Sequence, residues 1–217
     1  MSLHFCLSRK LLQTPRNTQQ ARNASQVAWC ALGILWIAQA ASAAESNRCA
    51  DTAARLDSLE GKVQWQAAGE SQWHEARLNQ TFCYGDTLIV QEKRAALRLS
   101  NNTLVRLNEH SSLKLIPPDK GFWVELSEGA AHFLTRTPKS FTVKAPYVNA
   151  AVEGTEFLVT AENGSNRVGV IEGVVRSGNP AGSVLLTQGQ STQTSGSQQA
   201  PIAPVVLKLN DFVSWAM

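Results

Sequence analysis

Residues 95–107, AALRLSNNTLVRL, decide the fold class of this 217-residue chain. Leu97 and Leu99 alternate with polar residues up to Asn101-Asn102, and the alternation resumes at Thr103. Side chains two positions apart lie on the same face of a strand, and Asn tolerates the positive φ of a tight turn. The stretch therefore predicts two strands that bury one face and are joined by a chain reversal.

The same period of two recurs between Leu59 and Leu186, for example in Ser112–Ile116 and Phe122–Leu126. Turn residues such as Asn163-Gly164 separate the runs, and no long amphipathic helix interrupts them. An alternating α/β enzyme scaffold is therefore not expected. We predict an all-β domain of stacked hairpins, arranged as a roll, a solenoid-like stack or a sandwich.

The segments that flank this region differ in composition. Within the lead-in, residues 44–60, Cys49, Ala53 and Leu56 have helical spacing, which predicts a short helix. Residues 191–204 are uncharged and rich in Gln, Ser, Thr and Pro, which is typical of a linker. Residues 205–217 are interpreted as the possible start of a truncated helical region, because Asn210 or Asp211 could cap a helix.

The front of the chain has the pattern of an export signal. Val27–Ala38 contains no charged residue, which suits a secretory signal and is shorter than the ~20 residues of a membrane-spanning helix. Ala41-Ser42-Ala43 places small residues where a signal peptidase cleaves. We expect residues 1–43 to be a cleaved signal peptide and the protein to be periplasmic or extracellular. The alternative is an uncleaved anchor in the inner membrane.

Net charge excludes one class of partner. The four basic residues Arg9, Lys10, Arg16 and Arg22 lie in the signal, and the rest of the chain has 16 basic and 17 acidic residues. A nearly neutral domain lacks the positive field that attracts polyphosphate, so no nucleic-acid partner is expected.

Two cysteines, Cys49 and Cys83, lie beyond the signal. In an oxidising compartment they would most simply form a disulfide, and the alternative is two buried thiols. A zinc site is not expected, since there is no Cys-x-x-Cys motif and His74, His110 and His132 are scattered. No cofactor is expected either.

Residues 61–190 resemble the FecR-type domains, the periplasmic sensor-regulator domains named after the ferric citrate regulator. The resemblance rests on Gly85-Asp86-Thr87, the hairpin at Ala95–Thr103, Leu126–Ala130 and the series Phe141–Pro146, Ala151–Phe157 and Val170–Val175. Its hallmark positions here are Gly154, Thr155, Glu156, Phe157, Glu172 and Gly173.

The resemblance implies a non-enzymatic module of the cell envelope that senses a signal or binds another envelope protein. The chain has only 26 residues ahead of its apolar segment, so the transmembrane anti-sigma arrangement of some FecR-type regulators is not expected. No catalytic motif of the common hydrolase, metalloprotease or phosphate-binding kinds is present, which also argues against an enzyme.

Three residues are candidates for partner contact. Arg98 and Arg106 occupy polar positions of alternating strands, where a solvated face is the commonest explanation. Trp123 would point outward if Val124 and Leu126 face the core, although packing at the core or an edge is the alternative. An outward Trp with neighbouring Arg residues also suits a sugar ring, so the alternative function is a cell-wall or glycan-binding module.

Overall fold

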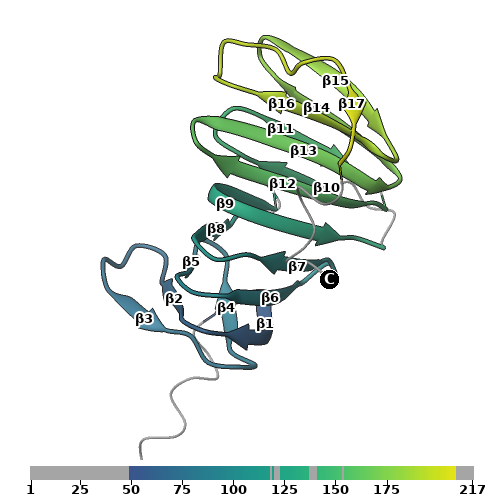
Figure 1. Ribbon diagram of the computed structural model, residues 1–217. Helices are drawn as coiled ribbons and strands as arrows, with labels where there is room; N and C mark the ends of the chain where they lie inside the picture. The colour runs from purple at the N-terminus through teal and green to yellow at the C-terminus, as the bar shows by residue number, and fades with distance from the viewer. Residues whose placement is uncertain (1–48, 118, 120–122, 137–140, 153, 209–217) are drawn as a thin grey trace, which may run out of the picture. The chain divides into compact units, whose positions relative to one another are not determined.

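In the computed structural model, seventeen strands make up nearly all of the regular structure of the described residues (Figure 1). The structure describes residues 49–208 apart from 118, 120–122, 137–140 and 153. These residues belong to the second of two compact units, Arg48–Met217, and the description concerns that unit alone. The prediction of an all-β domain is confirmed.

The strands occur in the following order: β1 Thr52–Glu60, β2 Val63–Gln66, β3 Trp73–Glu75, β4 Thr81–Cys83, β5 Thr87–Val90, β6 Arg94–Leu99, β7 Leu104–Leu107, β8 Ser111–Leu115, β9 Val124–Leu134, β10 Phe141–Lys144, β11 Asn149–Val152, β12 Glu156–Glu162, β13 Ser165–Glu172, β14 Val174–Asn179, β15 Gly182–Thr187, β16 Gln190–Thr194 and β17 Val205–Val206.

The strands form two ladders that share β9. Sheet A runs β4-β1-β6-β7-β9-β12-β13-β16-β17, and sheet B runs β3-β2-β5-β8-β9-β10-β11-β14-β15. All pairings are antiparallel except that of β9 with β10. Neither ladder closes on itself, so β4 and β17 are the edges of sheet A, and β3 and β15 are the edges of sheet B.

Strand β9 changes sheet at Gly129. Residues before it pair with β8 in sheet B, and residues after it pair with β7 and β12 in sheet A. Gly129 has φ +88°, and a Cβ there would overlap Ser111 and lie 2.7 Å from the carbonyl oxygen of His110. The Ser111 hydroxyl donates to the Ala130 carbonyl and accepts from the Ala130 amide, both at 3.0 Å. Only glycine allows this bend without strain.

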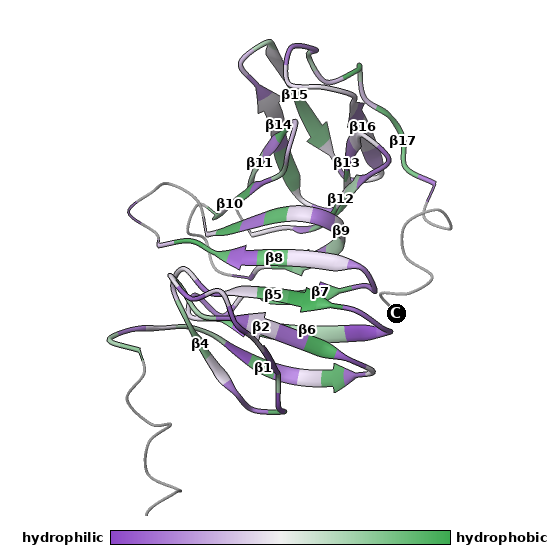
Figure 2. Ribbon diagram, turned by 90° about the vertical axis from the view of Figure 1, so that its left-hand side faces the viewer, coloured by the Kyte–Doolittle hydropathy of each residue, from purple (hydrophilic) through white to green (hydrophobic). Residues whose placement is uncertain are grey.

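The buried faces of both sheets contribute to one hydrophobic core. Leu97, Phe133 and Phe157 come from sheet A, and Leu113 and Leu126 come from sheet B. The rings of Phe133 and Phe157 stack with centroids 4.9 Å apart. Figure 2 shows the corresponding alternation of hydrophobic and hydrophilic residues along the strands, which is the period predicted from residues 95–107.

The prediction of a helical lead-in is wrong. Residues 52–60 form β1, which pairs with β4 and β6. Ala54 and Leu56 are buried in the core on one side of the strand. Pairing with two strands and core burial therefore override the helical spacing of this segment, because tertiary contacts outweigh local propensity.

The predicted linker is partly wrong as well. Gln190–Thr194 forms β16 and pairs with β13, while Thr192 and Thr194 are buried. Further along, the Ile202 amide donates to the Gln193 carbonyl at 3.0 Å. In the segment predicted to begin a helix, residues 205–206 form β17 instead, and residues 209–217 lie outside the described part of the chain. Residues 190–194 thus pair near the edge of sheet A despite their polar composition.

The disulfide between Cys49 and Cys83 is present and joins the residues just before β1 to the end of β4. The predicted signal peptide, residues 1–43, lies outside the described residues. Within the described ranges, no helix is long and apolar enough to cross a membrane.

Candidate partner-binding face

The outer face of sheet A, which points away from the core, carries most of the charged residues that form ion pairs. Arg98 and Arg106, two of the predicted contact residues, lie on this face on β6 and β7. They are diagonal neighbours, because Arg98 pairs with Leu104 and Ala96 pairs with Arg106. The alternation in residues 95–107 therefore identifies the correct face of both strands.

Asp57 on β1 binds two arginines at one end of this face. The Arg98 Nε donates to Oδ2 of Asp57 at 2.7 Å, and Arg55 lies 3.0 Å from Oδ1. The Asp57 side chain is only 17% exposed, whereas Arg98 is 43% exposed. Two cations converge on one carboxylate here, so part of the positive charge is available to an acidic group of a partner.

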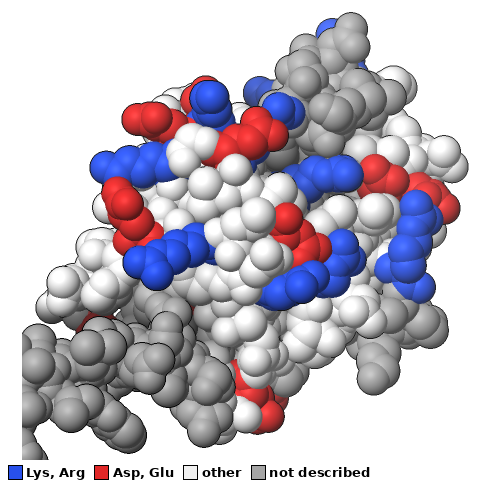
Figure 3. Space-filling view, turned by 90° about the horizontal axis from the view of Figure 1, so that it is seen from below, with Lys and Arg blue, Asp and Glu red and all other residues white. Residues whose placement is uncertain are grey.

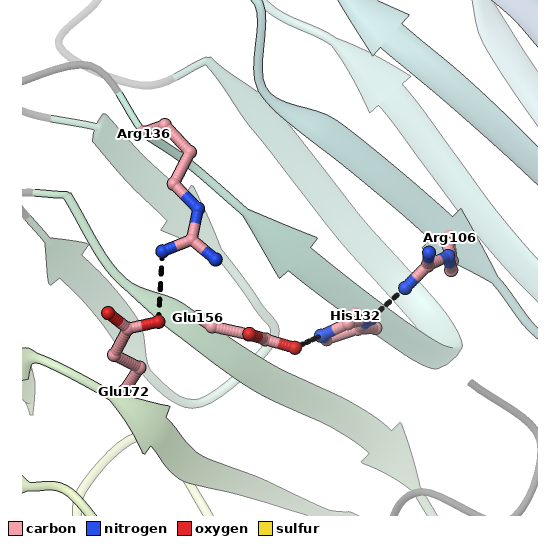
Figure 4. A network of polar contacts seen from close by, with 5 residues as sticks. All are labelled: Arg106, His132, Arg136, Glu156 and Glu172. Carbon is pink, nitrogen blue, oxygen red and sulfur yellow. Dashed lines mark hydrogen bonds and ion pairs between the residues drawn. The ribbon is translucent and has the colours of Figure 1, made fainter. Parts of the chain in front are cut away.

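Three residues from three strands form the central polar network of the outer face (Figure 4). His132 on β9 lies between Arg106 on β7 and Glu156 on β12. Nδ1 of His132 is 3.2 Å from Nη1 of Arg106, and Nε2 is 2.9 Å from Oε1 of Glu156. His132 is 2% exposed.

The partners of His132 define its tautomer. A guanidinium group only donates hydrogen bonds, so Nδ1 accepts from Arg106 and Nε2–H donates to Glu156. Burial lowers the pKa of His132 below its ordinary value of 6.5, and the positive charge of Arg106 acts in the same direction. Glu156 opposes both effects, but burial is the largest. The imidazole is therefore neutral near pH 7.

A second ion pair continues the charged face beyond Glu156. Glu172 on β13 is the cross-strand partner of Glu156, and its Oε2 accepts from Arg136 at 2.9 Å. Arg136 and Glu172 are 64% and 53% exposed, so water screens their attraction. Both remain accessible to a partner molecule.

The hallmark positions of the FecR resemblance have mainly structural roles. Phe157 is in the core, and Thr155 is buried. Gly154 and Gly173 both have positive φ. Glu156 and Glu172 are the two hallmark residues on the outer face, where Glu156 binds the imidazole of His132 on β9 and Glu172 binds Arg136, which follows β9.

Trp123 is placed differently from Arg98 and Arg106. It lies just before β9, is half-buried and packs against the core, with its ring centroid 6.4 Å from that of Phe141. Val124 and Leu126 are buried as expected. Trp123 therefore packs against the core instead of pointing outward, and it is not beside Arg98 or Arg106.

His132 is the buried titratable residue of the outer face. Both ring nitrogens of His132 already have partners, so it cannot act as a base without breaking this network. Among the residues with described positions, no three His, Cys, Asp or Glu side chains are grouped to hold a metal ion. Two hollows, of about 180 Å³ beside β16 and about 240 Å³ beside Tyr147, are open and shallow.

The network around His132 was not predicted from the sequence. Ala131 and Phe133 face the core, so the alternation does place His132 on the outer face. Its partners are 26 and 24 residues away along the chain, and only the strand register brings them together.

Comparison with known proteins supports the family resemblance. Residues 86–176 match the protein family described as "FecR protein", and this range contains Arg106, His132, Arg136, Glu156 and Glu172. No curated protein matches the chain.

Two crystal structures of a protein described as a "putative anti-sigma factor", from Parabacteroides distasonis, are similar to part of the chain. Each is 22% identical, with a TM-score of 0.48 over 54% of this chain. The chain spans 57% of the length of these proteins.

Proposed function

We propose that this chain, whose residues 86–176 match the FecR family, is a non-catalytic module of the cell envelope that binds another protein and takes part in sensing or relaying a signal. The contact surface would be the outer face of sheet A. The observation that carries the proposal is the His132 network with the neighbouring Arg136–Glu172 ion pair, because all five residues lie inside the matched range.

The shape of the described surface favours a macromolecular partner over a small molecule. Small-molecule sites usually enclose about 300–1,000 Å³. The hollows of about 180 and 240 Å³ are smaller than this. A flat sheet face with exposed charged residues suits another protein surface better.

The charge pattern favours a partner with both signs of charge. On the side of the molecule drawn in Figure 3, Lys and Arg alternate with Asp and Glu and do not form a patch of one sign. On the outer face of sheet A, Arg98 and Arg136 are exposed beside the acidic residues Asp57 and Glu172. Such alternation gives specificity and orientation more than affinity.

The edge of sheet B offers a second mode of protein binding. β15 has six residues, and Leu185 on it is 51% exposed. An edge strand presents unpaired main-chain groups that can bind an extended segment of a partner. β15 lies wholly after residue 176, where the FecR match ends. We therefore place the main contact on sheet A.

Photocrosslinking tests the proposal in cells that produce the protein. A photoreactive amino acid replaces Arg98 or Arg136 on the outer face of sheet A, Leu185 on β15, or Arg176 on the outer face of sheet B. The proposal expects discrete protein adducts from positions 98 and 136. Adducts from 185 alone would move the contact to β15, and adducts equal at all four positions would indicate random collision and overturn the proposal.

Charge reversal provides the matched control. Arg98→Glu and Arg136→Glu are expected to weaken capture of the crosslinked partner, whereas Arg176→Glu leaves capture unchanged because Arg176 is exposed on the opposite sheet. Saturable binding to peptidoglycan that Trp123→Ala abolishes would instead favour the glycan-binding alternative.

The place of action outside the cytoplasm is part of the proposal. A disulfide suits an oxidising compartment, and the apolar segment Val27–Ala38 suits an export signal. Fusion of residues 1–47 to a phosphatase that is active only outside the cytoplasm tests this point. An inactive fusion would contradict it.

A further inference from the structure

The edge strands of the two sheets differ in length and in protection. β3 and β4 have three residues each, and β17 has two. β15, at the top of Figure 1, has six residues and pairs with β14 without a bulge. Proteins usually protect a sheet edge by keeping it short or by placing charged residues, proline or a bulge on it. β15, with the sequence GSVLLT, has none of these features.

The open side of β15 presents the main-chain groups of alternate residues. The Thr187 amide donates to Oε1 of Gln190 at 2.9 Å, so it points away from β14. Main-chain groups alternate in direction along a strand, and those of Ser183 and Leu185 therefore point to the same side. Among the described strands, β14 alone pairs with β15. The N–H and C=O groups of Ser183 and Leu185 thus lie along an open edge.

The side chains at this edge are uncharged, and some are apolar and exposed. Leu185 on β15 is 51% exposed, and Val174 on β14 is 46% exposed. Both lie on the outer face of sheet B, because their neighbours Val175 and Leu186 are buried in the core. The sequence contains no charged residue at all between positions 176 and 208. An uncharged edge with an exposed leucine in its middle favours strand pairing.

We propose that β15 pairs antiparallel with β15 of a second copy of this chain, about a twofold axis at Leu185. In this register, Leu185 lies opposite Leu185 of the second copy, and Ser183 lies opposite Thr187. These side chains share the outer face, since residues an even number of positions apart lie on the same side of a strand. Val184 lies opposite Leu186 on the inner face, so sheet B and its buried face continue from one copy into the other.

The lack of charge identifies a second copy as the occupant. A twofold axis places each residue near the middle of β15 beside its own counterpart or a close neighbour. A charged residue there would meet a like charge, which destabilises paired strands. A segment of a different protein could instead pair with a charged edge through complementary charges. An edge free of both signs of charge therefore suits self-pairing best.

The contact is small, so the association should be weak and depend on concentration. The facing residues, 183–187, bury less area than the roughly 1,600 Å² of a standard protein interface. We expect a dissociation constant of about 10–100 μM. The inference does not depend on the proposed function, because β15 belongs to sheet B and the outer face of sheet A is not part of the contact.

Cysteine crosslinking of the purified protein tests the register. Opposite residues of antiparallel strands have Cα atoms about 4.5–5.5 Å apart, within the range of a disulfide, so Leu185→Cys should crosslink two copies. Arg176→Cys is the matched control. Arg176 is the exposed register partner of Leu185 on β14, and two copies of it would lie about 14 Å apart across the axis.

We expect mild oxidation to join the Leu185→Cys variant into dimers at least about tenfold faster than the Arg176→Cys variant. The wild type, in which Cys49 and Cys83 are already joined, gives the background rate. Equal rates for the two variants would indicate random collision and would overturn the proposal.

Sedimentation equilibrium gives a second measurement without crosslinking. Leu185→Lys places like charges opposite each other and should raise the dissociation constant at least about tenfold. Leu78→Lys, which replaces another exposed leucine outside the strands, should leave the constant unchanged. A protein that stays monomeric well above the expected constant, or a dimer that Leu185→Lys does not weaken, would contradict pairing through β15. No other protein is present, so these outcomes are independent of the contact proposed for sheet A.

Discussion

Arg106 and His132 lie directly opposite each other on β7 and β9, with Nη1 of Arg106 3.2 Å from Nδ1 of His132. The contact requires an unprotonated Nδ1. The guanidinium group of arginine has only N–H donors, so it could not accept a hydrogen bond from a protonated Nδ1. A proton on this nitrogen would break the hydrogen bond and place two positive charges side by side. The folded protein therefore favours neutral His132.

The first prediction concerns pH. Since the pKa of His132 is lowered in the folded protein, the unfolded chain takes up a proton at higher pH than the folded one. The free energy of unfolding should therefore fall as the pH decreases through the range just below 6.5, and this contribution should be fully present above 6.5. Urea unfolding between about pH 7.5 and about pH 5 measures it.

His132→Gln is the informative variant for this prediction, because an amide can accept from Arg106 and donate to Glu156 without titrating. Its stability should depend less on pH in that range. His74→Gln is the matched control, since His74 is 38% exposed and should keep the wild-type dependence. Identical pH profiles for His132→Gln and the wild type would contradict the prediction.

The second prediction concerns the disulfide. Cys49 and Cys83 are 34 positions apart, so reduction should lower the free energy of unfolding by about 3–4 kcal/mol in the loop-entropy model. Urea unfolding with and without a reductant measures the loss. The double variant Cys49→Ser/Cys83→Ser should match the reduced protein and should not respond to the reductant. No difference between the oxidised and reduced forms would refute this assignment.

The third prediction concerns the bend in β9. Gly129→Ala places a methyl group against Ser111 and the His110 carbonyl, while Gly164→Ala meets no atom within 4 Å. Both positions have positive φ, so both variants have the backbone strain of about 1–2 kcal/mol. Gly129→Ala should lose clearly more stability, or fail to fold. Equal losses in thermal unfolding would show that the contact with Ser111 is easily relieved.

The fourth prediction concerns Asp86, which is 1% exposed. Its carboxylate accepts from the Ala68 amide at 3.1 Å and the Cys83 amide at 2.9 Å. Asp86→Ala leaves both amides without this acceptor and should cost about 2–4 kcal/mol. Glu92→Ala, at an exposed site, should cost less than about 0.5 kcal/mol. A wild-type unfolding curve for Asp86→Ala would mean that water replaces the carboxylate.

Alternation predicted the strands that bury one face. Residues 95–107 form β6, a turn and β7, and Arg98 and Arg106 lie on the outer face. The Cys49–Cys83 pair was predicted from the compartment and the cysteine count, and it is present. The strand faces follow from the local alternation of residues, and the disulfide follows from there being two cysteines beyond the signal. Both can be read from the sequence without knowing which strands pair.

Features that depend on strand register could not be predicted. The change of sheet within β9 follows from the contact of Gly129 with Ser111, and the network joins residues from β7, β9 and β12. The segments 52–60 and 190–194 form strands because neighbouring strands offer them partners. Their composition alone indicated a helix and a linker.

The open edges of the two sheets affect how much related chains can differ in length. β3 and β4 end the ladders on one side, and β15 and β17 end them on the other, whereas the shared β9 occupies the middle of both. Hairpins could be gained or lost at either extremity without altering the centre. Related chains could therefore differ in length by whole hairpins and still keep the histidine and its two neighbours in place.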